Sequence, residues 1–162
     1  MENLFTPNKI RLYSGIYFDP FEPDIDLIKI EDIAHGLSLQ CRFGGHTQNF
    51  FSVAQHSCNV HLLHGANDLA ALLHDAQEAY LIDIPSPLKS RIIGYKEAED
   101  NLAKMIAEKF QFQYPLEQDV KNADQWALQV EWDLYVLNPG NGLTPKQAEK
   151  KFLWEFNKIK KA

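Results

Sequence analysis

The segment from Asn67 to Asp83 places acidic and imidazole side chains inside an otherwise apolar stretch. His74 and Asp75 are adjacent, and Glu78 follows three residues after Asp75. Burial of an unpaired carboxylate costs several kcal/mol, so something must offset it. A bound cation is one answer, and a hydrogen-bonded His–Asp pair is the other. For an isolated His–Asp dipeptide the hydrogen-bonded pair is the simpler interpretation.

Two polar residues elsewhere favour the cation. His56 lies within a helix predicted over residues 52–64, and a short loop would bring this helix alongside the His74 segment. Asp124 lies on the apolar stripe of a helix predicted over residues 116–137. Two imidazoles and two carboxylates from three helices suit a first-row divalent ion and leave positions open for water and substrate. The candidate metal ligands are His56, His74, Asp75 and Asp124.

Capping residues and prolines indicate which helices must position these ligands. Ser52 and Gln55 fit a capping box, and Gly65 is a typical helix end. Further helices are predicted over residues 30–38, 67–82 and 95–110, and from Pro145 to the C-terminus, where Thr144, Pro145 and Gln147 form a complete start signal. The first 50 residues are otherwise irregular, Pro85 and Pro87 break the chain, and no strong hairpin signal occurs. The predicted fold class is all-α.

Composition narrows the functional class. The chain has 162 residues, with 45% hydrophobic and 23% charged, which is an ordinary globular mix that favours one domain over residues 1–162. The formal net charge of −6 argues against binding a nucleic-acid polymer over a broad face. The two cysteines are too few for a disulfide scaffold. No apolar run is long enough to span a membrane, and no secretory h-region opens the chain, so a cytoplasmic protein is expected.

The four candidate ligands resemble the H…HD…D signature of the HD-domain metal-dependent phosphohydrolases. The stretch HDAQEAYLIDIPSPLK (His74–Lys89) is similar to the bacterial 5′-deoxynucleotidase branch, as are VAQHS around His56 and VKNADQWALQVEW around Asp124. An Arg–aromatic pair, Arg42-Phe43, also fits that branch. The resemblance covers roughly residues 42–132. It implies an HD-type helical bundle with a core over about residues 42–137 and an irregular N-terminal segment.

The resemblance also implies roles for individual residues. Glu78, together with the metal ligand Asp75, is the expected catalytic pair, with Glu78 orienting the attacking water or carrying its proton. Arg42 would contact the phosphate, and Lys89 would supply a second cation there. Asp83 would accept a hydrogen bond from the sugar 3′-hydroxyl.

Two positions depart from the family pattern. Phe43 stands where members of the family often carry a tryptophan that crowds a ribose 2′-hydroxyl, so strict selection of deoxyribose is in question. His46 has no family counterpart, but Gly44 and Gly45 let the backbone approach a ligand there. His46 is therefore either a further phosphate contact or a loop histidine.

The resemblance implies removal of the 5′-phosphate from (deoxy)nucleoside monophosphates, with one divalent ion (Co²⁺, Mn²⁺, Zn²⁺, Ni²⁺ or Fe²⁺) as cofactor. A small dNTP triphosphohydrolase with the same metal site is the first alternative, although it would need more cations than Arg42 and Lys89. A non-catalytic nucleotide-binding domain is the second. The family often forms homodimers, and aromatic residues near Trp126 and Trp154 could contribute to such an interface, although a packing face is the simpler interpretation of Phe152, Trp154 and Phe156.

Overall fold

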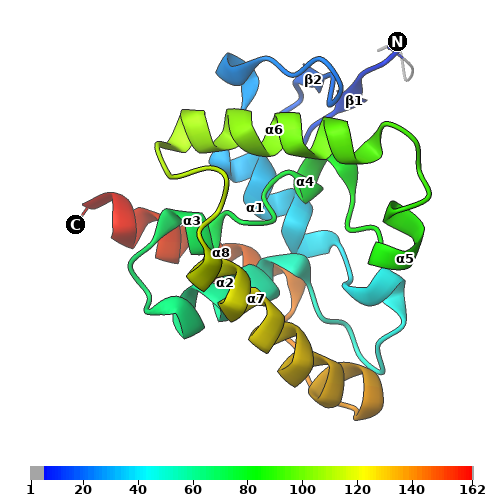
Figure 1. Ribbon diagram of the computed structural model, residues 1–162, viewed down its shortest axis with the longest axis vertical. Coiled ribbons are helices and arrows are strands. Elements are labelled where there is room, and N and C mark those ends of the chain that lie inside the picture. Colours follow the sequence, from blue (N-terminus) through cyan, green and yellow to red (C-terminus); the bar gives the residue numbers. More distant parts are fainter. Residues whose placement is uncertain (1–5, 162) are drawn as a thin grey trace.

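The structure is built mainly from helices (Figure 1). It is a computed structural model, and it describes residues 6–161. In chain order the elements are β1 (Ile10–Arg11), β2 (Tyr17–Phe18), η1 (Ile25–Leu27), α1 (Ile30–Leu39), η2 (Phe43–Gly45), α2 (Val53–His64), α3 (Leu69–Leu72), α4 (Glu78–Leu81), α5 (Ser86–Lys89), α6 (Tyr95–Phe110), α7 (Gln118–Glu131), η3 (Trp132–Leu137) and α8 (Pro145–Lys161). The all-α fold class is confirmed.

A small antiparallel hairpin precedes the helices. Strands β1 and β2 pair in the register Ile10↔Phe18, and Phe18 is fully buried. Each strand has two residues, which is too short for an alternating apolar pattern that the sequence could display.

The helix starts predicted from capping residues are confirmed at α2 and α8. The Ser52 hydroxyl accepts a hydrogen bond from the Gln55 N–H at 3.1 Å. The Thr144 hydroxyl accepts from the Gln147 N–H at 3.4 Å, and the Gln147 side chain accepts from the Thr144 N–H at 2.9 Å, which completes a capping box. Gly65 follows the end of α2 with a φ of 123°, as expected of a helix-ending glycine.

The predicted back-reach of the Gln55 side chain is wrong. Its amide nitrogen donates to the Tyr135 hydroxyl at 3.3 Å, and its amide oxygen accepts from the Leu143 N–H at 2.6 Å. Both partners are distant in sequence. The Gln55 side chain therefore connects α2 to η3 and to the loop before α8, and it does not cap its own helix.

The single helix predicted over residues 67–82 is also wrong. Asp68 caps α3 by accepting from the Ala70 N–H at 2.8 Å. However, α3 ends at Leu72, and the chain becomes helical again only at Glu78. The His74 ring donates from Nδ1 to the Ala71 carbonyl at 3.0 Å within this break. Helical spacing therefore does not explain how Glu78 reaches the same region as His74.

The interval after α4, where Pro85 and Pro87 were expected only to break the chain, contains the short helix α5. Proline is tolerated in the first turn of a helix, because the N–H groups there have no intrahelical acceptor. The helix predicted over residues 116–137 begins two residues later, at Gln118, and ends at Leu137 as predicted, but it changes from α7 to the π-helical segment η3 at Trp132.

Helix α2 is central to the packing and contacts α1, α3, α7 and α8. In Figure 1, α7 runs from the middle of the molecule to its lower edge, where it continues into η3. The largest fully buried side chains include Phe18, Ile33, Leu37, Phe51, Leu72, Leu102 and Phe152. Phe152 and Phe156 are buried as a packing face, whereas Trp154 is exposed. No helix in residues 6–161 is both long and apolar enough to cross a membrane.

Candidate metal centre

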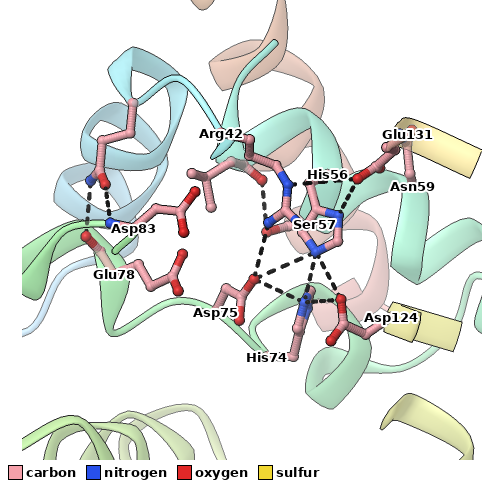
Figure 2. A network of polar contacts seen from close by, with 12 residues as sticks. Arg42, His56, Ser57, Asn59, His74, Asp75, Glu78, Asp83, Asp124 and Glu131 are labelled. Atoms are coloured by element: carbon pink, nitrogen blue, oxygen red, sulfur yellow. Dashed lines mark hydrogen bonds and ion pairs between the residues drawn. The ribbon is translucent and has the colours of Figure 1, made fainter. Parts of the chain in front are cut away.

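The four predicted ligands converge, although they come from three separate parts of the chain (Figure 2). His56 Nε2 lies 3.1 Å from Asp124 Oδ1, 3.5 Å from Asp75 Oδ2 and 3.2 Å from His74 Nε2. His74 Nε2 lies 3.1 Å from Asp75 Oδ2 and 3.7 Å from Asp124 Oδ1. Helix α2 contributes His56, the break between α3 and α4 contributes His74 and Asp75, and α7 contributes Asp124.

Both imidazoles present the same ring nitrogen to the cluster. His56 donates from Nδ1 to Glu131 Oε2 at 2.8 Å, and His74 donates from Nδ1 to the Ala71 carbonyl at 3.0 Å. When the rings are neutral, these bonds leave the lone pair of each Nε2 directed at the cluster.

The donor atoms fit a small divalent ion. Ligand atoms bound at about 2.0–2.2 Å to one ion lie roughly 3–3.5 Å from one another, which matches most of the separations above. Donor atoms of His56, His74 and Asp75 all lie within 4.8 Å of one another. Two imidazole nitrogens with two carboxylate oxygens form the mixed donor set that first-row divalent ions accept. The His56–His74–Asp75 group can therefore hold a metal ion, and Asp124 is placed to complete it.

The electrostatics favour positive charge at the centre of the cluster. Burial and the charge of Arg42 both lower the pKa of His56. The neighbouring carboxylates, above all Glu131, have the larger effect and raise the pKa of His56 to about 9. Burial also opposes the charged form of His74, yet the charge of Asp75 raises the His74 pKa well above 6.5. The pKa of Asp75 is held well below its usual range, because the two imidazoles outweigh its desolvation.

Arg42 lies between the candidate metal ligand Asp75 and the carboxylate of Glu131. Its side chain is buried, with NH1 3.7 Å from Asp75 Oδ2 and Nε 3.6 Å from Glu131 Oε2. Its Nε atom has no hydrogen-bond partner among the described residues. The cation predicted to contact phosphate is thus beside the candidate metal ligands.

Glu78 and Asp83 occupy the other side of Asp75, and Figure 2 shows both carboxylates pointing toward the space beside it. Glu78 is 4% exposed, and its Oε2 has no hydrogen-bond partner among the described residues. Burial, together with the charges of Asp75 and Asp83, raises the Glu78 pKa well above 4.5. Burial also raises the pKa of Asp83. Both carboxyl groups therefore bind a proton more readily than an exposed acid does.

A residue that the sequence analysis missed, Gln40, holds this side of the site. Its amide nitrogen donates to the Glu78 carbonyl and its amide oxygen accepts from the Asp83 N–H, both at 2.9 Å. Between these two residues Ile82 has a φ of 71°, which is an unusual conformation for a β-branched side chain. The Tyr95 hydroxyl contacts the Ile82 carbonyl at 2.7 Å. No local pattern marks Gln40, because both partners are distant in sequence.

The remaining predicted site residues differ in placement. Lys89 Nζ lies 2.5 Å from Glu99 Oε1 and 3.4 Å from Glu78 Oε1, so its charge is already engaged by carboxylates. The Phe43 ring lies 5.3 Å from the Arg42 guanidinium carbon. His46 is exposed, and its side chain makes no hydrogen bond or ion pair within residues 6–161. The structure thus brings Lys89 and Phe43 to the site's margin and leaves His46 outside its polar network.

No family model matches the chain. The chain is 41% identical over 124 residues to the uncharacterized protein YfdR of Escherichia coli (strain K12). The aligned segment covers 75% of this chain and 69% of YfdR. It is 38% identical over 136 residues to an uncharacterized protein of Rhodobacter capsulatus, with the same coverage of both chains. This chain belongs to the family of YfdR.

Proposed function

We propose that the protein is an HD-type metal-dependent phosphohydrolase that removes the 5′-phosphate from (deoxy)nucleoside monophosphates. The observation that carries the proposal is the convergence of His56, His74, Asp75 and Asp124 beside a buried arginine and a buried glutamate. A divalent ion held there would activate water and neutralise phosphoryl charge.

Arg42 binds the phosphate in this proposal. Its buried, planar guanidinium can donate two parallel hydrogen bonds to phosphate oxygens. The ion pair with Asp75 holds it next to the candidate metal ligands, so one phosphate can contact both at once.

Glu78 accepts the proton of the attacking water and later delivers it to the leaving 5′-oxygen. Its raised pKa makes it a stronger base than an exposed carboxylate, which favours its taking a proton from water. Asp83, which Gln40 holds beside Glu78, accepts a hydrogen bond from the sugar 3′-hydroxyl.

The charge balance around the site favours a monophosphate over a triphosphate. Lys89 is paired with Glu78 and Glu99, and Arg42 is already beside two carboxylates. Arg91 and Lys96, the next cations along the chain after Lys89, are exposed. A triphosphate carries more negative charge than these groups can neutralise.

The test is a phosphate-release assay on protein loaded with Mn²⁺ or Co²⁺, using nucleoside mono-, di- and triphosphates with and without the 2′-hydroxyl. We expect phosphate from dAMP or dCMP, and a loss of about 10²–10⁴-fold in kcat for Glu78→Gln. Glu149→Gln, which changes a half-buried acid paired with His35, should keep full activity. Release of tripolyphosphate would identify the triphosphohydrolase instead, and nucleotide binding without turnover would identify a non-catalytic domain.

A further inference from the structure

Glu131 is a buried carboxylate surrounded by three donors from two other segments. It is 2% exposed and is the last residue of α7. Its Oε2 lies 2.8 Å from His56 Nδ1 and 3.6 Å from Arg42 Nε, and its Oε1 accepts from Asn59 Nδ2 at 2.9 Å. One oxygen therefore faces both a candidate metal ligand and the candidate phosphate-binding cation (Figure 2).

We propose that Glu131 is a positioning residue that holds His56 and Arg42 in one fixed arrangement and so couples the metal centre to the phosphate subsite. The part that concerns His56 needs only the metal site, whereas the part that concerns Arg42 rests on the proposed function.

The contact with His56 sets which ring nitrogen faces the ion. A carboxylate only accepts hydrogen bonds, so the bond requires a proton on Nδ1 and leaves Nε2 for the cluster. It also fixes the ring plane, so that Nε2 stays 3.1 Å from Asp124 Oδ1. Loss of such an outer carboxylate typically weakens metal binding 10–100-fold.

The contact with Arg42 fixes a guanidinium that has few other partners. Arg42 Nε is buried and makes no hydrogen bond to any residue from 6 to 161, and Glu131 Oε2 is the carboxylate oxygen paired with it. Asp75 pairs with the other end of the guanidinium through NH1. Arg42 is thus held between a metal ligand and the residue that orients another metal ligand.

Helix α7 delivers both acidic groups. Asp124 and Glu131 lie about two turns apart and therefore on the same face of the helix. The wider π-helical turns of η3 begin at the next residue, Trp132, and such turns occur frequently at functional sites. Asn59, one turn after His56 on α2, takes the second carboxylate oxygen, so that Oε2 stays with His56 and Arg42.

The test measures Co²⁺ binding to the metal-free protein by calorimetry, without substrate. Glu131→Gln should weaken binding 10–100-fold, because a neutral amide is a weaker acceptor for the His56 Nδ1–H than a carboxylate. Glu155→Gln is the matched control, because Glu155 on α8 is buried to a similar degree and faces another histidine of α2. Its Oε2 lies 3.6 Å from His61 Nε2, but it does not contact the candidate metal ligands. It should leave Co²⁺ affinity unchanged.

A reciprocal exchange separates orientation from general stability. Asn59→Asp should also weaken Co²⁺ binding, because two carboxylates then face each other. The double variant Asn59→Asp/Glu131→Gln should bind Co²⁺ more tightly than Asn59→Asp alone, since the carboxylate repulsion is removed and the glutamine can accept from His56 and donate to the new carboxylate. Should Glu131→Gln fail to fold, the comparison of Asn59→Asp with the double variant carries the test.

The outcomes are distinct. Equal Co²⁺ affinity in all folded variants, with only their melting temperatures changed, would overturn the positioning role. Failure of the unmodified protein to bind Co²⁺ would overturn the proposed function as well. For Arg42, Glu131→Gln should raise KM for dAMP at saturating metal, and an unchanged KM would overturn the coupling to the phosphate subsite.

Discussion

At the scale of single residues, the four donors are held with different firmness. His56 is fully buried and His74 is 7% exposed, whereas 40% of the Asp124 side chain is exposed. Hydrogen bonds to Nδ1 orient both imidazoles. Asp124 depends mainly on the placement of α7, so it is the donor whose removal disturbs the fold least.

Asp124→Asn tests the donor set without removing a buried side chain. The amide is neutral and a poorer ligand, so we expect Mn²⁺ affinity to fall at least about tenfold while the melting temperature of the metal-free protein changes little. Calorimetric titration with Mn²⁺ measures this. Asp119→Asn, an exposed acid on the same helix that pairs with His64, is the control, and equal losses in the two variants would contradict the assignment of Asp124.

Phe43 is the residue at which sugar selection can be tested. Its ring lies beside Arg42 and packs edge-on against Trp132, with 5.6 Å between ring centres. Under the proposed function, Phe43→Trp adds bulk near the ribose 2′-hydroxyl. We expect the ratio of kcat/KM for dAMP to that for AMP to rise. A ratio that stays constant would place the sugar away from Phe43.

At the scale of elements, the interruption between α3 and α4 makes the site. A continuous helix would direct the adjacent residues His74 and Asp75 about 100° apart. In the structure both side chains instead meet His56. The positive φ of Ile82 then turns the chain after α4, and Gln40 bonds to residues on both sides of that turn.

Gln40→Leu should loosen this turn. It leaves the Glu78 carbonyl and the Asp83 N–H without their partner, which costs about 1–3 kcal/mol in the free energy of unfolding. Urea denaturation measures this loss, and KM for dAMP should rise because Asp83 is less well placed. Gln48→Leu, which removes an exposed side-chain bond to the Val136 carbonyl, should cost less; equal costs would show that Gln40 does not support the turn.

At the scale of the whole molecule, α8 closes the fold against α1, α2 and α3. His61 on α2 is buried opposite Glu155 on α8, with 3.6 Å between Nε2 and Oε2. Burial lowers the pKa of His61 in spite of that carboxylate. Homodimerisation stays a prediction. Trp126, Trp132 and Trp154 are exposed and so are available for a dimer interface.

The His61 pKa predicts how stability depends on pH. The folded-state pKa of His61 is below the unfolded value of about 6.5, so the unfolded chain binds the proton more readily. The stabilising contribution of neutral His61 is therefore complete above pH 6.5. It falls as the pH decreases through 6.5 toward the folded-state pKa. Free energies of unfolding at several pH values between 7.5 and 5 measure it. His61→Leu should flatten the profile relative to the unmodified protein; parallel profiles would contradict the shift.

The sequence by itself was sufficient to predict the all-α fold class, the starts of α2 and α8, and the convergence of His56, His74, Asp75 and Asp124. Capping is local in the chain, and polar side chains on apolar helix faces are visible without coordinates. Only the tertiary structure decided the break after Leu72, the partners of Gln55, and the positions of Gln40 and Glu131. The positions of Gln55, Gln40 and Glu131 depend on hydrogen bonds between residues far apart in sequence, and the break after Leu72 brings His74 against His56 on another helix. Neither helical periodicity nor residue propensity encodes such contacts.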